Sequence, residues 1–346
     1  MGRIVKHLKN NYKIIIGIII GVVISGCGVY AATVIAASSV GYTDNASLGA
    51  TNVQDAIDKL NTKATTKIKE AEAKCPDGYK CIKPLCKRAT TLHTETCSQT
   101  STSAYCQADG YALNDTITYG NLGTTGTLTS GDAFDCDVNG DGVYDSATER
   151  FYYVSDMTNG VTQDSNTAVL IYYNNVSGGV ASNSTAYAYD SSGKNNNGPV
   201  TAKEQLPTTS QWSNVNLTNT TRAITNQSGG NTTSAGNLST TFSYAGYAAR
   251  LLTYQEVYSG CYDGTTNIAS TKGLSTKCKY LMENTKYSSS SLKTSGEWLE
   301  SPFASYSNFA WCVHAYTRVA GSITVNNPGN NGVRPAIEVL KSNISY

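Results

Sequence analysis

The run "DCDVNGDGVYD", residues 135–145, holds the side chains of this chain that are best suited to bind a hard cation. An EF-hand-type calcium loop takes ligands at positions 1, 3, 5 and 9, and it needs a glycine at position 6. Counting from Asp137, the glycine is Gly142, and the four ligand positions hold Asp137, Asn139, Asp141 and Asp145. We therefore expect these four residues to bind one structural Ca²⁺ ion.

The end of this loop departs from the EF-hand pattern. Val143 offers a backbone carbonyl at position 7, but position 12 is Thr148, where the usual ligand is a bidentate glutamate. Glu149 follows one residue later, so that glutamate is missing or out of register. The alternative interpretation is a hairpin loop rich in Asx turns that binds no metal.

Catalytic constellations are scarce in the sequence. The chain has only three histidines, His7, His93 and His314, and it contains no GxSxG, HExxH, phosphate-loop or dinucleotide motif. Cys312 and His314 stand two apart, which suits a nucleophile and a base, but unrelated roles explain this spacing more simply. We expect a protein that is not an enzyme.

Ten cysteines indicate disulfide bonding in an exported protein. Cys261 and Cys278 would close a loop worth about 3 kcal/mol in the chain-entropy account. Most of the others crowd into one segment, namely Cys75, Cys81, Cys86, Cys97 and Cys106, with Cys136 nearby. A zinc knuckle formed by His93, Cys97 and Cys106 is the alternative for this segment.

The N-terminus predicts export. Residues 1–13 form a basic cytoplasmic segment, and residues 14–40 form an apolar transmembrane anchor or signal segment. "VYA", ending at Ala31, fits a signal-cleavage site, and "ISGC", ending at Cys27, resembles a lipobox. An uncut anchor, a secreted protein and a lipoprotein therefore all stay open, and each of them places residues 44–346 outside the cell.

Residues 44–74 predict a short helical stalk. Asn52 is a suitable N-cap for a helix that starts at Val53, and its apolar residues fall on one narrow stripe: Val53, Ile57, Leu60, Ala64 and Ile68. Such a stripe favours a homo-oligomer formed through residues 53–70. A helix packed on its own domain is the alternative.

Beyond the stalk we expect a disulfide-rich ectodomain over residues 75–346. Strands are predicted at "TITYG", "GTLTS", "RFYYVSD" and "AVLIYYNNV", and a short helix near Gln211 and Trp212. Thr253 and Glu256 form a capping box that starts another short helix. From Gly296 onward the pattern is rich in strands, and Glu300, Arg334 and Trp298 are expected to have structural roles.

The C-terminal residues carry a resemblance to a known family. "WLESPF", "AW.V", "NN" and "GVRPAIEV" resemble the end of an uncharacterised domain family of Firmicutes surface proteins, and "YAARLLTYQEV" resembles the element that precedes it. That family is related in fold to C-type lectins and to the formylglycine-generating-enzyme superfamily. The resemblance implies an α+β, C-type-lectin-like C-terminal domain, with ligand binding in residues 245–346.

Alternation along the segment from Phe309 separates two faces. Trp311, Val313, Thr317 and Val319 fall on an apolar face, whereas Cys312, His314, Tyr316 and Arg318 fall on the opposite one. We expect a ligand-binding surface formed by Tyr306, Ser307, Asn308, His314, Tyr316, Arg318, Asn327 and Asn330. The Asn, Tyr, Ser and His mixture of residues 305–331 is also compatible with a region varied by a diversity-generating retroelement.

The sequence thus predicts a recognition or adhesion protein on the surface of a Gram-positive-type bacterium, anchored by its N-terminal helix and binding an unidentified extracellular protein or glycan. The net charge of +1 provides no field to attract nucleic acid. Two alternatives stay open: a structural stalk or fibre subunit, and a cryptic enzyme of the formylglycine-generating type. The second needs a pair of active-site cysteines that the sequence does not identify.

Overall fold

The computed structural model describes residues 53–59, 83–101, 103, 106, 112–159, 163–183, 185–223, 241–261, 276–285, 296–303, 306–314, 318–329 and 331–346. Only the backbone is described at residues 159, 276–277 and 318–322. The chain divides into two compact units, Met1–Ile82 and Lys83–Tyr346. The predicted basic segment and the anchor at 14–40 lie outside the described residues.

In the first unit, residues 53–59 are helical, and they lie within the predicted helix. Two side-chain pairs four residues apart support it, an ion pair of Lys59 with Asp55 and a hydrogen bond from Gln54 to Asp58. The rest of the predicted stalk is outside the described residues. No described helix is both long enough and apolar enough to cross a membrane.

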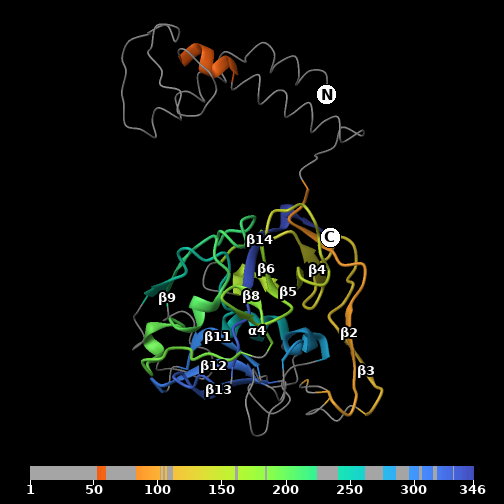
Figure 1. Ribbon diagram of the computed structural model, residues 1–346, viewed down its shortest axis with the longest axis vertical. Helices are drawn as coiled ribbons and strands as arrows, with labels where there is room; N and C mark the ends of the chain where they lie inside the picture. Colours follow the sequence, from red (N-terminus) through yellow and green to blue (C-terminus); the bar gives the residue numbers. More distant parts are fainter. Residues whose placement is uncertain are drawn as a thin grey trace. The chain divides into compact units, whose positions relative to one another are not determined.

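A six-stranded sheet forms the centre of the second unit (Figure 1). Its strand order is β14-β6-β5-β4-β1-β15. The C-terminal strand β15 is therefore an edge strand, and it runs parallel to its neighbour β1, the first strand of the unit. The strands are β1 (Cys86–Arg88), β4 (Ala133–Cys136), β5 (Arg150–Asp156), β6 (Thr167–Tyr172), β14 (Ala336–Leu340) and β15 (Ile344–Ser345).

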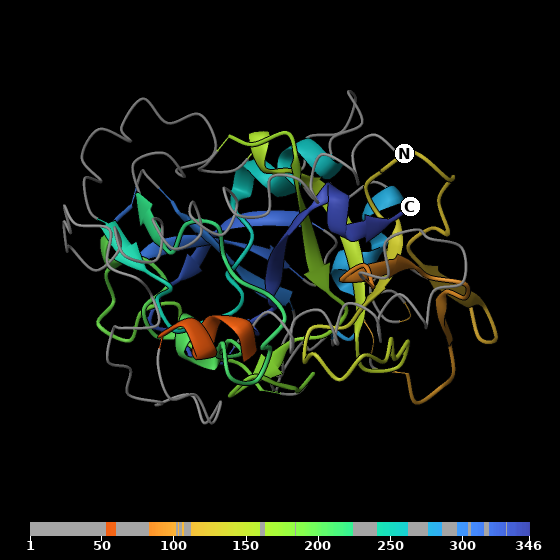
Figure 2. The same cartoon turned by 90° about the horizontal axis from the view of Figure 1, so that it is seen from above.

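Both faces of this sheet are buried, which explains why the residues of "RFYYVSD" and "TAVLIY" are buried almost throughout rather than alternately. Phe151 and Leu170 belong to one core cluster, while their neighbours Tyr152 and Ile171 belong to the other. β5 coincides with the predicted strand at residues 150–156, and β6 covers most of the next one. Figure 2 shows β14 (blue) running beside these long strands.

A three-stranded antiparallel sheet carries the C-terminal candidate residues. It consists of β11 (Gly296–Pro302), β12 (Phe309–His314) and β13 (Arg318–Thr324), in that order. In Figure 1 these blue strands lie at the end of the unit away from the C-terminus. Bridges from Arg250 to Ala336 and from Glu297 to Gly332 connect the surrounding segments.

The helices are few and short, so the described fold is mostly β-sheet with an α+β character. α4 (Tyr254–Cys261) is the longest helix of the second unit's described residues, and its start confirms the predicted capping box. The Glu256 amide donates to Thr253 Oγ1 at 3.1 Å, and the Thr253 amide donates to Glu256 Oε2 at 2.8 Å. The 3₁₀ helices are η2 (Met157–Asn159), η3 (Asn195–Asn197), η4 (Ala202–Gln205), η7 (Thr276–Met282) and η8 (Lys341–Asn343).

Three two-stranded ribbons complete the described structure: β2 (His93–Thr96) with β3 (Thr116–Tyr119), β7 (Val176–Ser177) with β8 (Val180–Ala181), and β9 (Thr221–Ala223) with β10 (Thr241–Ser243). The predicted strand at 126–130 is wrong, because this segment is a loop around Arg88. The Arg88 guanidinium donates to the carbonyls of Leu122, Thr124 and Thr127. Residues 209–212 form turns instead of the predicted helix.

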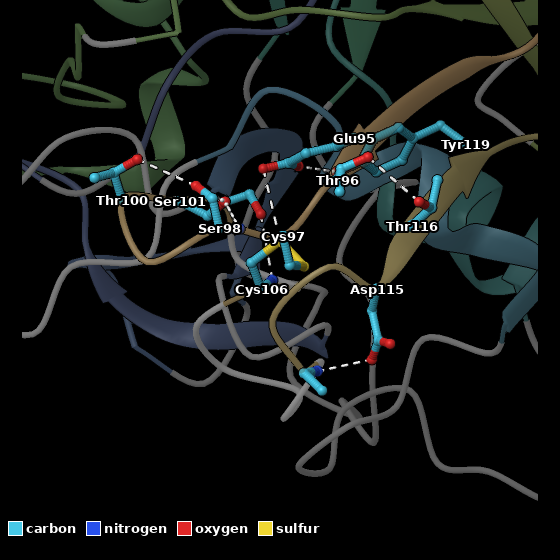
Figure 3. The surroundings of a disulfide bond; sticks show 12 residues. Glu95, Thr96, Cys97, Ser98, Thr100, Ser101, Cys106, Asp115, Thr116 and Tyr119 are labelled. Atoms are coloured by element: carbon cyan, nitrogen blue, oxygen red, sulfur yellow. Dashed lines mark hydrogen bonds between the residues drawn. A yellow bond between two sulfur atoms is a disulfide. The ribbon is translucent and has the colours of Figure 1, made fainter.

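Three disulfides confirm the expectation of oxidised cysteines: Cys86–Cys136, Cys97–Cys106 and Cys261–Cys278. The zinc-knuckle alternative is wrong, because Cys97 and Cys106 are bonded to each other (Figure 3). His93 contacts Glu283 and the Ser146 carbonyl, each at 2.6 Å. Burial alone would lower the pKa of His93, but the hydrogen bond and the charge of Glu283, together with the hydrogen bond to the Ser146 carbonyl, outweigh burial and raise it.

A cluster of buried charged side chains joins distant segments of the second unit to one another. Its five members are fully or almost fully buried and come from distant segments: Arg222, Arg250, Glu256, Glu300 and Glu338. Arg250 donates to Glu338 Oε1 at 2.7 Å and forms two bonds to Glu256, at 2.8 and 2.5 Å. Arg222 donates to Glu300 Oε1 at 2.8 Å.

The structural roles predicted for Glu300 and Trp298 fit the burial of their side chains. Arg334 is also buried, and its guanidinium donates to the backbone carbonyls of Tyr280, Leu281 and Glu283.

Glu297 on β11 gives the protein a pH-dependent stability. Its side chain is buried, both carboxylate oxygens lack hydrogen-bond partners, and burial raises its pKa from 4.5 to about 7, although Arg334 opposes this. The folded state holds this proton to a higher pH than the unfolded chain does. The free energy of unfolding should therefore fall by about 3 kcal/mol as the pH rises from 4.5 past 7.

Urea unfolding at pH 5 and at pH 8 measures this effect. Glu297→Gln should reduce the slope by the share that Glu297 contributes, whereas Glu204→Gln, at an exposed position of η4, should leave it unchanged. A Glu297→Gln variant that loses stability with pH as steeply as the wild type would contradict the assignment.

Candidate functional site

The turn at residues 306–309, between β11 and β12, presents three of the predicted ligand-binding residues. Tyr306 is 57% exposed, and Ser307 and Asn308 are exposed beside it. Tyr306 stacks on Phe303 with ring centroids 6.0 Å apart and meets Phe309 edge-on at 5.5 Å. An aromatic side chain is thus both exposed and supported from two sides.

Asn195, at the start of η3, forms hydrogen bonds to the backbone of this turn. Its fully buried side-chain amide donates to the carbonyls of Phe303, Tyr306 and Phe309 at 2.9, 2.8 and 2.6 Å. Its backbone amide donates to the Ser307 carbonyl at 2.7 Å. The two hydrogens of Nδ2 are shared among three carbonyls and the backbone amide reaches a fourth, so one asparagine contacts four carbonyls of a segment more than a hundred residues away in sequence.

The loop that contains Asn195 is itself fixed by Asp190. The buried Asp190 carboxylate accepts hydrogen bonds from the Ser192 amide and hydroxyl and from Asn197 Nδ2, all at 2.7 to 2.9 Å. The Asp190 amide in turn donates to the Val325 carbonyl at 3.1 Å. Residues 190–197 thus join the 306–309 turn to the turn that follows β13.

The turn at 325–329 lies beside the 306–309 turn. Phe309 and Thr324 are cross-strand partners, and the Val325 amide donates to the Asn308 carbonyl at 2.9 Å. Asn327, a predicted ligand-binding residue that is partly exposed, accepts the Gly329 amide at 2.9 Å. Tyr306, Ser307, Asn308 and Asn327 therefore gather at one end of the β12–β13 hairpin. We call these four residues the turn cluster.

The continuous strand predicted through residues 309–319 is wrong. β12 ends at His314, and Arg318 is its cross-strand partner, so the chain reverses between them. His314 lies five residues from Phe309 along β12, or about 16 Å at the usual rise per residue, and Arg318 lies six residues from Thr324 along β13. They occupy the far end of the hairpin from the turn cluster, so the predicted single surface divides into two.

The face of β12 that we expected to be exposed for ligand binding is buried along most of its length. Cys312 is fully buried in one core cluster, while Trp311 and Val313 pack into the other. The physical reason is that β12 is the central strand, between β11 and β13, with packed side chains on both faces. His314, at the end of β12, is partly exposed. Tyr316 and Asn330 lie outside the described residues, as does the side chain of Arg318.

The predicted calcium loop joins β4 to β5, and its side chains hold its backbone. Asp137 accepts the amides of Gly140 and Gly142 at 2.9 and 3.0 Å, and Asn139 accepts the Asp141 amide at 2.8 Å. Gly140 and Gly142 both have φ near +80°, a conformation that favours glycine. These contacts are compatible with both interpretations of the loop.

The second half of the loop is ordered around Asp145. Its carboxylate accepts the Ala147 amide at 2.9 Å and the Thr148 hydroxyl at 2.8 Å, and these bonds lower the pKa of Asp145. No three His, Cys, Asp or Glu side chains among the described residues converge in a metal-holding arrangement. The predicted ion therefore stays a prediction.

Sequence reasoning missed Asn195 and Asp190. Both lie in the stretch rich in Asn, Ser, Thr and Gly between residues 177 and 240, where no hydrophobic period distinguishes a structural asparagine from an exposed one. Their role depends on contacts with residues 303–309 and 325, which local spacing does not encode. Comparison of the chain with family models, curated proteins and solved structures finds no match to any of the three.

Proposed function

We propose that this chain is a cell-surface recognition protein that binds an extracellular ligand through the turn cluster. The observation that carries the proposal is the exposed Tyr306 on a turn whose carbonyls are fixed by the buried Asn195. Tyrosine is enriched among the residues that dominate binding energy at protein interfaces. Ser307, Asn308 and Asn327 add polar groups around it.

Rigidity is the physical advantage of this arrangement. A binding loop that is ordered in advance loses little conformational entropy when it meets its ligand. The amide of Asn195 and the stacked ring of Phe303 both restrict the turn before any ligand arrives.

His314, Tyr316, Arg318 and Asn330 belong to the proposal as an additional part of the surface. The register supports treating His314 and Arg318 as one group, because they are opposite each other in the ladder. A ligand that contacts both this group and the turn cluster must extend along the hairpin.

A C-type-lectin-like fold is part of the proposal, supported by the C-terminal motif and by the mixed, mostly β architecture. The three disulfides support an oxidising location, as does the basic and apolar N-terminus. Seven of the ten cysteines are described. Six of these are in disulfides and Cys312 is buried, an arrangement that favours binding over a cryptic thiol-dependent enzyme.

Protease treatment of intact cells tests the location. Export predicts that fragments from beyond residue 44 are released while the cells remain closed. Full protection of the chain in intact cells, with digestion only after lysis, would contradict a surface location.

Screening the purified chain against immobilised glycans and a displayed peptide library tests the function. A recognition protein should show saturable binding to a restricted set of probes, and the free probe should compete for it. Assembly into long polymers with no saturable binding would favour the fibre-subunit alternative instead.

A further inference from the structure

Glu149, the last residue before β5, is a buried carboxylate without an evident partner for its charge. Only 4% of it is exposed, and its Oε1 atom has no hydrogen-bond partner. Its Oε2 atom accepts the backbone amide of Asp145 at 3.1 Å, which places the carboxylate against the inner side of the β4–β5 loop. No ion pair to Glu149 is found among the described residues.

The surroundings of Glu149 add negative charge. The carboxylates of Asp141 and Asp137 lie near enough to repel a charge on Glu149. An ionised carboxylate this deeply buried beside two like charges is unfavourable in the fold unless it takes up a proton or a cation balances it. The structural feature that needs explaining is therefore a buried carboxylate that lies near two other carboxylates and forms no ion pair among the described residues.

The remaining oxygens of the loop suit a hard cation. Each carboxylate oxygen has two lone pairs, so those that accept one loop amide keep one for a metal. Ca²⁺ takes six to eight oxygen ligands, and carboxylates bind it through one or both oxygens. The Thr148 hydroxyl, at the position where an EF-hand glutamate would stand, donates to Asp145 Oδ2 and so positions a neighbouring ligand.

We propose that Glu149 completes a Ca²⁺ site with Asp137, Asn139, Asp141 and Asp145, one residue later than the EF-hand spacing. The ordered loop around it supports this assignment. Lys83 Nζ donates to the Gly142 carbonyl at 3.0 Å, and Ser213 and Asn214 hold the carbonyls of Asn139 and Asp137 at 2.7 and 2.8 Å. Because the ligands do not converge in the described structure, binding must draw the exposed Asp141 and Asp145 inward toward Glu149.

This site is separate from the turn cluster, so either proposal can fail without the other. Titration of the full chain with Ca²⁺ alone, followed by calorimetry, tests it. Tb³⁺ luminescence excited through tyrosine provides a second readout, because Tyr144 lies within the loop and Tyr172 donates to the Thr148 carbonyl at 2.7 Å. We expect one Ca²⁺ per chain and Tb³⁺ emission that Ca²⁺ quenches by competition.

Glu149→Gln should weaken Ca²⁺ binding at least tenfold, while Glu204→Gln, which removes an exposed carboxylate, should leave the dissociation constant unchanged. Without metal, Glu149→Gln should melt no lower than the wild type, since it removes a buried charge; this control separates lost binding from lost folding. Unchanged affinity in Glu149→Gln, or no Ca²⁺ binding by the wild type at millimolar concentration, would overturn the proposal.

Discussion

Arg250→Met is expected to destabilise the second unit by about 3–5 kcal/mol. Arg250 is fully buried and forms ion pairs with Glu256 and Glu338. Its removal therefore leaves the buried Glu256 carboxylate without its main ion-pair partner, and Glu338 also loses an ion pair. Burial alone would raise the pKa of Glu256, but Arg250 outweighs burial and holds it below its ordinary value. Without Arg250, that carboxyl should take up a proton or unfold its surroundings.

Denaturant unfolding of the variant measures this cost. The double variant Arg250→Met with Glu256→Met removes both members of the closest pair, so it should recover part of the lost stability. Loss of less than about 1 kcal/mol in the single variant would show that the cluster contributes little, and the account of these charges would be wrong.

Trp311→Ala is expected to cost about 3–5 kcal/mol of stability. Trp311 is 4% exposed and packs against Tyr254 at 4.4 Å and Phe303 at 5.1 Å between ring centroids. Removal of the Trp311 side chain leaves a cavity next to Phe303, the ring on which Tyr306 stacks. Tyr306→Ala, by contrast, should change stability by no more than about 1 kcal/mol, because that ring is largely exposed.

Thermal or urea unfolding of the two variants, measured together, distinguishes core from surface. Leu340→Ala provides a matched control, since Leu340 is 51% exposed at the end of β14, a strand of the six-stranded sheet and not of the sheet that carries the turn cluster. If Tyr306→Ala unfolds the protein while Trp311→Ala leaves it intact, the assignment of these two residues is inverted.

Much of the local structure could be predicted from the sequence. β5 and α4 follow from signals within a few residues, an apolar run bounded by polar turns and a Thr–Glu capping box. The hairpin after His314 was missed because "AYT", residues 315–317, contains no Gly, Pro, Asn or Asp to mark a reversal. Without that signal, an alternating pattern is indistinguishable from one long strand.

The candidate sites could be predicted only in part. The oxygen-bearing residues of the calcium loop stand in one short run, so their types and spacing are visible in the sequence. The burial of Glu149 and the clamp by Asn195 depend on packing between distant segments, which no local pattern records. Tyr306, Ser307 and Asn308 were predicted from residue type, whereas the structure supplies the support that distinguishes them from an ordinary loop.

The affinity of the purified chain for a glycan or peptide selected on the arrays, compared between the wild type and three variants, tests the central claim most directly. Tyr306→Ala and Asn308→Ala should each weaken binding by more than about fivefold, which corresponds to about 1 kcal/mol, while Leu340→Ala should not change it. Wild-type affinity in both turn variants, or an equal loss in Leu340→Ala, would show that the ligand does not bind at the turn cluster.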